Sequence, residues 1–184
     1  RDLRMSRGLG DVYKRQEMAN FLGICYCELG DFQKGLVIFN EIASQDNPKY
    51  AEDVVKAKEN IKLYTNNRIA KLQGENDFDG IIAVADEMLA VNPQDALAQK
   101  IRLQALFDKK DYAGVIASAE EAAAGQTDEE ERSDVYFILG AAYNARTMPQ
   151  QAIDALSKVT AGANVAAAQK TVAQLKENAA KANS

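Results

Sequence analysis

The chain contains no histidine, no tryptophan and only two cysteines among its 184 residues. The missing histidine excludes imidazole general-base catalysis, Ser-His and Cys-His nucleophile pairs, and nearly all zinc sites. Because no apolar run reaches the roughly 18 residues that a spanning helix needs, we expect no transmembrane segment. Most enzyme mechanisms are therefore excluded before any motif is considered.

Acidic residues outnumber basic ones by 27 to 22, which gives a formal net charge of -5, and no basic block follows the first fifteen residues. We therefore expect no nucleic-acid partner, and an anionic membrane is a poor candidate as well. Hydrophobic residues make up 47% of the chain and charged residues 27%, which is close to the globular average. The composition thus predicts one packed domain or one short array of repeats.

The two cysteines, Cys25 and Cys27, stand two residues apart. On a helix this spacing points their side chains in different directions, so they cannot form a disulfide with each other. Two small buried apolar side chains are the favoured interpretation, and a Cys-x-Cys metal site is the alternative. We expect neither a metal nor a cofactor.

Residues 1–16, RDLRMSRGLGDVYKRQ, are basic and do not join the pattern that follows. The stretch Asp11–Gln16 can be encoded as GAT GTG TAT AAG AGA CAG, which resembles the transposon mosaic end used as a sequencing-library adapter. We interpret residues 1–16 as a non-native or disordered segment, with an ordinary basic N-terminal arm as the alternative. Under the first interpretation the native chain begins at or before Glu17, and a signal peptide, lipid anchor or earlier repeats are missing.

From Glu17 onward, apolar residues recur at steps of three and four, and strand-like alternation is absent. This pattern predicts an all-α fold. Predicted helix N-caps are Asn47 and Asn92, each followed by proline, and Thr127 and Thr147, each with a capping-box partner three residues later. The predicted breaks between helices lie at Gly30–Asp31, Gly74–Asp77, Lys109–Asp111, Gly125–Gln126 and Ala161–Gly162.

Self-comparison of the sequence gives a period of about 34 residues, a usual length for a helix–turn–helix repeat. Aligning Asp31, Asp77, Asp111 and Met148 superposes four units, at 16–49, 62–95, 96–129 and 133–166. The first and fourth units carry the same pattern, namely Leu22-Gly23 with Tyr26 and Leu139-Gly140 with Tyr143. This pattern resembles the tetratricopeptide repeat (TPR). The resemblance implies an α-solenoid of antiparallel helical hairpins in a right-handed superhelix; an α-solenoid of another family is the alternative.

The second and third units depart from this pattern. Ile69 and Leu103 replace the glycine, and Leu72 and Leu106 replace the tyrosine. Because glycine lets the two helices of a hairpin approach closely, we expect the larger residues to spread these hairpins slightly.

Two stretches that extend beyond the repeat units also predict helices. Residues 49–73 contain no glycine or proline, so we expect one long helix that projects about three turns beyond the array, with a two-helix split near residues 65–67 as the alternative. Residues 163–181 are rich in alanine and predict a C-terminal capping helix over the last hairpin.

No catalytic constellation is present in the sequence. The acidic run Asp128–Glu131 is better explained by the start of a helix, where negative charge is favourable, than by acid-base catalysis. Neither an EF-hand spacing nor a phosphate-binding glycine loop occurs. We therefore expect a protein that is not an enzyme.

The resemblance to TPR proteins implies that the first helices of the hairpins line a concave groove that binds a partner peptide or protein. Amide side chains suit this role because each offers a donor and an acceptor to a peptide backbone. The carboxylate clamp of some members is incomplete here, since only Asn20, Asn67 and Lys100 could contribute to it. The groove positions correspond to Asn20, Ile24, Cys27, Asn66, Asn67, Ala70, Gln73, Lys100, Gln104, Phe107, Phe137, Ala141 and Asn144.

The sequence thus predicts a non-catalytic protein-interaction scaffold. The alternative is a repeat fragment, truncated at its N-terminus, of a larger enzyme or of a glycan or small-molecule binder; the lack of tryptophan disfavours the glycan binder. The stretch Lys158–Asn164 resembles the ends of alanine-rich repeat proteins of the bacterial envelope. Cytoplasmic and periplasmic or envelope locations both stay open, and so does the oligomeric state.

Overall fold

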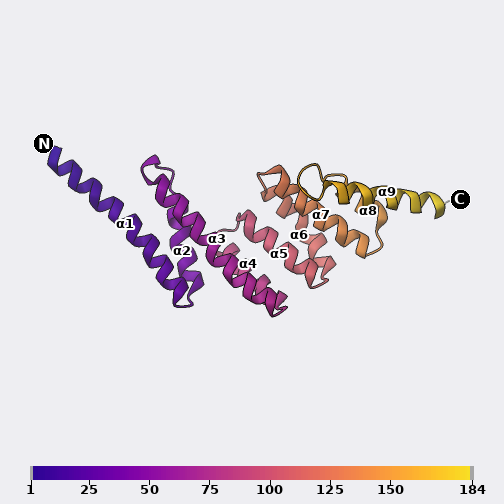
Figure 1. Cartoon of the computed structure of the whole chain (residues 1–184), viewed down its shortest axis with the longest axis horizontal. Coiled ribbons are helices and arrows are strands. Elements are labelled where there is room, and N and C mark those ends of the chain that lie inside the picture. Colours follow the sequence, from indigo (N-terminus) through magenta and orange to yellow (C-terminus); the bar gives the residue numbers. More distant parts are fainter. Residues whose placement is uncertain (1, 183–184) are drawn as a thin grey trace. The chain divides into compact units, whose positions relative to one another are not determined.

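The computed structural model describes residues 2–182, and the side chains of residues 15–181. Within that range every regular element is a helix, so the all-α prediction is confirmed (Figure 1). No helix among these residues is both long and apolar enough to cross a membrane. The elements are α1 (Asp2–Glu28), α2 (Phe32–Ala43), the 3-10 helix η1 (Pro48–Tyr50), α3 (Ala51–Gly74), α4 (Phe78–Val91), α5 (Ala96–Asp108), α6 (Tyr112–Gly125), α7 (Glu129–Ala145), α8 (Pro149–Leu156) and α9 (Val165–Ala182).

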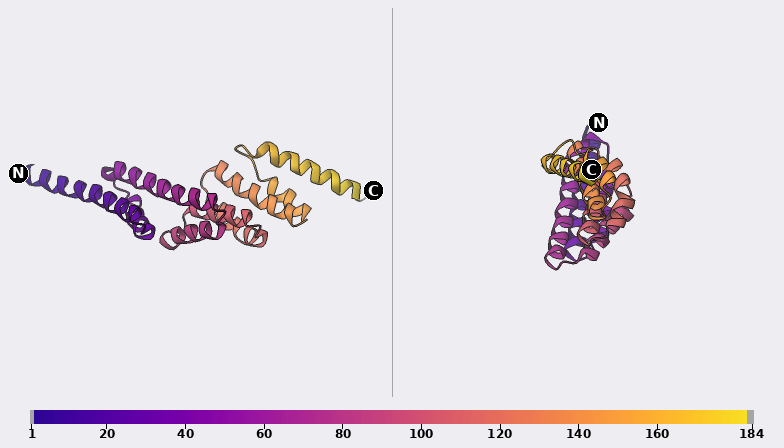
Figure 2. Two further views of the ribbon diagram at one scale, coloured as in Figure 1. Left: turned by 60° about the horizontal axis from the view of Figure 1, so that its bottom comes forward. Right: turned by 90° about the vertical axis from the view of Figure 1, so that its right-hand side faces the viewer.

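The helices form two compact parts. The N-terminal part consists of the residues up to Asn76 together with Ala90–Pro93, and in it α1, α2 and α3 pack on one another. The C-terminal part consists of Asp77–Leu89 and the residues from Gln94 onward. In that part α5 to α9 pack in chain order, and α5 also contacts α7 (Figure 2). In both parts, therefore, helices that are neighbours in sequence are neighbours in space.

Four turns between helices share one backbone conformation. Each contains a residue with a positive φ, and that residue always stands fourteen positions after the first residue of its predicted unit. The φ angles are 88° at Gly30, 54° at Asn76, 65° at Lys110 and 55° at Thr147. The alignment of the four units made on sequence therefore coincides with one recurring turn geometry.

The residue after the positive φ opens the second helix of each unit. In three units it is an aspartate whose carboxylate accepts a hydrogen bond from the backbone N–H three residues later: Asp31, Asp77 and Asp111. In the fourth unit it is Met148, which forms no side-chain cap, and Pro149 follows it at the first helical position. The fourth second helix, α8, is thus the least well capped of the set.

Replacing Thr147 by glycine is expected to stabilise the protein. A β-branched residue is strained at a positive φ, whereas glycine adopts this conformation freely. We expect the free energy of unfolding to rise by about 1 kcal/mol, which corresponds to about 3 °C in Tm for a chain of this size. Thermal unfolding followed by circular dichroism measures the change. Thr127→Gly, at a residue without a positive φ, is the control; an equal gain there would contradict the explanation.

Three of the four predicted caps are wrong, because a neighbouring residue takes the position. Asn47 accepts a hydrogen bond from the Lys49 N–H as predicted, although it opens η1 instead of an α-helix. Asn92 precedes a turn, and Asp95 caps α5 by accepting from the Ala98 N–H. Aspartate competes well with asparagine or threonine for this role.

The other two errors concern Thr127 and Thr147. Asp128, immediately after Thr127, caps α7 by accepting from the Glu131 N–H. Thr147 has a positive φ, and its hydroxyl donates to the carbonyl of Arg146. A spacing of three residues between Thr and Glu or Gln therefore did not identify the caps in this chain.

The long third helix is confirmed, since α3 runs unbroken from Ala51 to Gly74, and the split near residues 65–67 is wrong. The projection of its first half is also wrong. Asp53, Ala57 and Ile61 are buried, and the Asn20 side chain of α1 donates to the Asp53 carbonyl. The first half of α3 packs on α1 because α1 is itself a long helix.

Residues 2–16, which the sequence sets apart, belong to α1 in the structure. They continue without a break into the stretch that the repeat pattern assigns to the first unit. The interpretation of residues 1–16 as a non-native or disordered segment stays a prediction, and the side chains of residues 1–14 lie outside the described residues.

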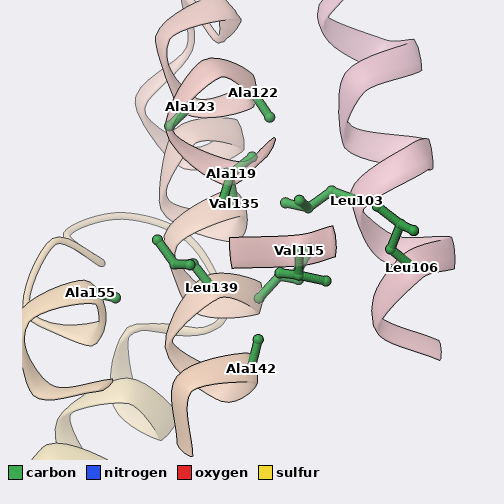
Figure 3. Packing of buried hydrophobic residues seen from close by; sticks show 11 residues of the cluster. Leu103, Leu106, Val115, Ala119, Ala122, Ala123, Val135, Leu139, Ala142 and Ala155 are labelled. Atoms are coloured by element: carbon green, nitrogen blue, oxygen red, sulfur yellow. The ribbon is translucent and has the colours of Figure 1, made fainter. Parts of the chain in front are cut away.

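One buried cluster joins three helices, α5, α6 and α7, with one residue of α8. Figure 3 shows Leu103 of α5, Val115 of α6 and Leu139 of α7 pointing into it. Leu103 stands where the first and fourth units have glycine, and Ala119 of α6 belongs to the same cluster. In the other two units the residue sixteen positions after the glycine is large, Phe39 or Leu156. The third hairpin therefore exchanges the large and the small partner, which offsets the spreading expected from Leu103 alone.

Candidate functional site

In α1 the predicted groove residues take part in packing. Asn20 is 6% exposed and donates to the Asp53 carbonyl at 3.3 Å. Ile24 and Cys27 are half-buried. Burial raises the pKa of the Cys27 thiol to about 11, and the nearby Glu28 carboxylate adds to the effect, so the thiol is protonated at neutral pH. The first helix therefore offers few free polar groups at these positions.

In α3 all four predicted residues are exposed. Asn66, Ala70 and Gln73 lie on the side of the helix opposite the buried stripe Asp53, Ala57, Ile61 and Thr65, and Asn67 lies beside them. We call these four exposed residues the α3 amide face. Its three amides present both donors and acceptors to solvent.

In α5 the predicted groove residue Lys100 forms ion pairs with residues of this same chain. The Lys100 ammonium bridges the carboxylates of Glu131 and Asp134 on α7, with an Nζ–Oδ2 distance of 3.1 Å to Asp134. Burial opposes its charge, but the hydrogen bonds to these two carboxylates raise the pKa of Lys100. Asn164 also donates to Asp134, at 2.9 Å. Lys100 and Asp134 occupy different positions of their units, so the repeat alignment gave no signal for this pair.

The other two α5 residues differ in exposure. Gln104 is exposed and donates to the Asp108 carboxylate one turn later, at 2.9 Å. Phe107 packs against the core cluster and meets Tyr112 edge to face, with ring centroids 5.5 Å apart. The apolar side chain expected to hold a ligand thus belongs to the hairpin interior.

In α7 the C-terminal helix approaches the predicted residues. Phe137 packs against the cluster of Leu156, Val159 and Ala168, to which α9 contributes Ala168. Ala141 is half-buried. Asn144 is exposed and lines a hollow together with α9 residues such as Gln174 and Asn178. Here α9 takes part of the surface that the resemblance assigns to a partner.

The structure thus places ten of the thirteen predicted residues in two groups, and Gln104, Ala141 and Asn144 belong to neither. Those with direct packing or ionic roles are Asn20, Ile24, Cys27, Lys100, Phe107 and Phe137. The α3 amide face is the one continuous group that stays exposed. Within the described residues, no group of three cysteine and acidic side chains is placed to hold a metal ion.

One exposed surface was missed by the sequence analysis. Met18, Phe21 and Leu22 of α1 are 71%, 67% and 49% exposed, and together with Cys25 they line an apolar hollow of about 790 Å³. The spacing of these four residues places them on one side of the helix. We call Met18, Phe21, Leu22 and Cys25 the α1 apolar stripe. The sequence could have revealed the stripe, because the same spacing of four apolar residues recurs in the buried α7 residues Val135, Ile138, Leu139 and Ala142.

No protein-family model and no curated protein matches this chain.

Proposed function

We propose that this chain is a non-catalytic scaffold of the tetratricopeptide-repeat type that binds a partner peptide or protein on the exposed side of its first helices. The observation that carries the proposal is the recurring turn at Gly30, Asn76, Lys110 and Thr147. Solenoid proteins consist of stacked repeats, such as helix–turn–helix units, and present extended binding surfaces.

The α3 amide face is the proposed contact for a peptide backbone. Asn66, Asn67 and Gln73 are exposed on α3, and each can donate and accept a hydrogen bond. An extended peptide has the same alternation of N–H and C=O groups. Lys100 and Phe107 are excluded from this role because each has a partner within the chain.

Selection of displayed random peptides on the purified chain tests this proposal. We expect Asn67→Ala combined with Gln73→Ala to weaken a selected peptide at least about tenfold, the cost of one or two lost hydrogen bonds. Isothermal titration calorimetry measures the affinity, and circular dichroism checks that the variant is folded.

The matched control removes exposed amides from second helices. Gln33 of α2 and Gln151 of α8 are exposed glutamines, and Gln33→Ala with Gln151→Ala is expected to leave the affinity unchanged. Equal weakening by both double variants would contradict the assignment of the α3 amide face. Failure to select any peptide would contradict the proposed function itself.

A further inference from the structure

The α1 apolar stripe has a counterpart in the same chain. Met18, Phe21, Leu22 and Cys25 stand at the same positions of the first unit as Val135, Ile138, Leu139 and Ala142 of the fourth. The two sets differ sharply in burial. The four α7 residues are 0%, 8%, 2% and 0% exposed, whereas Met18, Phe21 and Leu22 are about half to two-thirds exposed or more.

The structure shows what covers this face in α7. Val135, Ile138, Leu139 and Ala142 pack into one cluster with residues of the preceding hairpin, α5–α6 (Figure 3). The facing side chains are small or branched aliphatics: Leu103, Leu106, Val115, Ala119, Ala122 and Ala123.

The same face of the first helix meets the preceding second helix in the other two units. In α3, Tyr64 stacks on Phe39 of α2, and the Arg68 guanidinium lies 4.6 Å from the centre of the Phe32 ring. In α5, Arg102 forms an ion pair with Asp86 of α4 at 3.0 Å, and Ala98 is fully buried. The α1 face is the one member of the set without such a partner among the described residues.

We propose that the α1 apolar stripe is a docking surface for a further helical hairpin, one that presents small and branched aliphatic side chains as α5–α6 presents them to α7. The composition of the stripe agrees with this occupant. Leucine occupies the same position in both helices, at Leu22 and Leu139. All four stripe residues are apolar, as in α7, whereas most of the equivalent α3 residues are polar. An exposed apolar patch of this kind marks a contact surface. The corresponding residues of α3 are Tyr64, Asn67, Arg68 and Lys71, so Asn67 belongs both to this face and to the α3 amide face.

The test fuses such a hairpin to α1 in the same register that α5–α6 has relative to α7. A second copy of residues 96–132 is joined directly to Gln16 in place of residues 1–15, because residue 133 occupies in the fourth unit the position that Gln16 occupies in the first. Phe21→Ala with Leu22→Ala is then made in this extended chain and in the full chain. Leu63→Ala in both backgrounds is the control, since Leu63 is 53% exposed on α3.

We expect the double substitution to change Tm by less than about 1 °C in the full chain and to lower it by about 5 °C or more in the extended chain. The extended chain is also expected to bind less of the dye 8-anilinonaphthalene-1-sulfonate. Equal effects of the substitutions in the two chains would overturn the proposal. A full chain that sediments as a dimer, and that Leu22→Asp converts to a monomer, would also overturn it by assigning the stripe to a second copy.

Discussion

Gly140→Leu is expected to destabilise the protein by about 3 kcal/mol or more, because the site has no room for a side chain. A Cβ at Gly140 would lie 2.5 Å from Cγ of Leu156 on the facing helix, far closer than carbon atoms approach. Leu156→Ala alone is expected to cost about 2–5 kcal/mol through the cavity that it leaves. Urea unfolding measures both changes.

The double variant Gly140→Leu with Leu156→Ala is expected to lose much less free energy of unfolding than the two single variants lose in sum. The third hairpin already carries this combination, with Leu103 on the first helix and Ala119 on the second. We therefore expect Gly140→Leu with Leu156→Ala to recover at least about 2 kcal/mol of coupling energy. Gly74→Leu is the control, since nothing lies within 4 Å of a Cβ at that site. Strict additivity in the double variant would show that the two hairpins are not equivalent.

Asp53→Asn is expected to stabilise the protein by about 2 kcal/mol at pH 7, the scale of an unsatisfied buried polar group. Asp53 is 1% exposed, and neither carboxylate oxygen has a hydrogen-bond partner. The side-chain oxygen of Asn20, which contacts the same residue, is also buried without one. An asparagine keeps the shape, removes the charge and brings two donors to this site.

The pH dependence of stability provides a second measurement on Asp53. Burial raises the pKa of this carboxyl, nearby Lys56 lowers it, and Glu52 and Glu17 raise it further, with a net upward shift. Between the unfolded and the raised folded pKa the native state binds more protons, so stability falls as pH rises through this window and is constant above it. Asp53→Asn is expected to abolish this slope, and Asp46→Asn, at an exposed site, to leave it unchanged. A gain in the Asp53 variant that is the same at pH 4 and pH 7 would contradict the explanation.

The helices could be predicted from the sequence because their ends are marked locally. Each predicted break coincides with a loop or helix end in the structure, and the uninterrupted apolar pattern of residues 49–73 gives the single helix α3. The burial of Asp53 could not be predicted, since an aspartate in the first turn of a helix is usually solvated. It depends on how far α1 extends, which the repeat pattern of the first unit does not contain.

The candidate site was predicted less well than the fold. Repeat alignment identifies which side of a first helix a residue occupies, and the exposure of Asn67 and Gln73 agrees with it. It does not identify which side chains find partners on the next helix, as Lys100 does on α7. For Phe137 the deciding element is α9, nearly all of which follows the last repeat unit.

The packing between sequence neighbours has a consequence for how the chain acquires its structure. The main contacts join helices that are one or two elements apart, such as α5 with α6 and α7. Loop closure between such close segments costs little entropy, so proteins with this kind of topology fold in microseconds to milliseconds. We expect each hairpin to form as soon as its second helix has left the ribosome, before the rest of the chain has been synthesised.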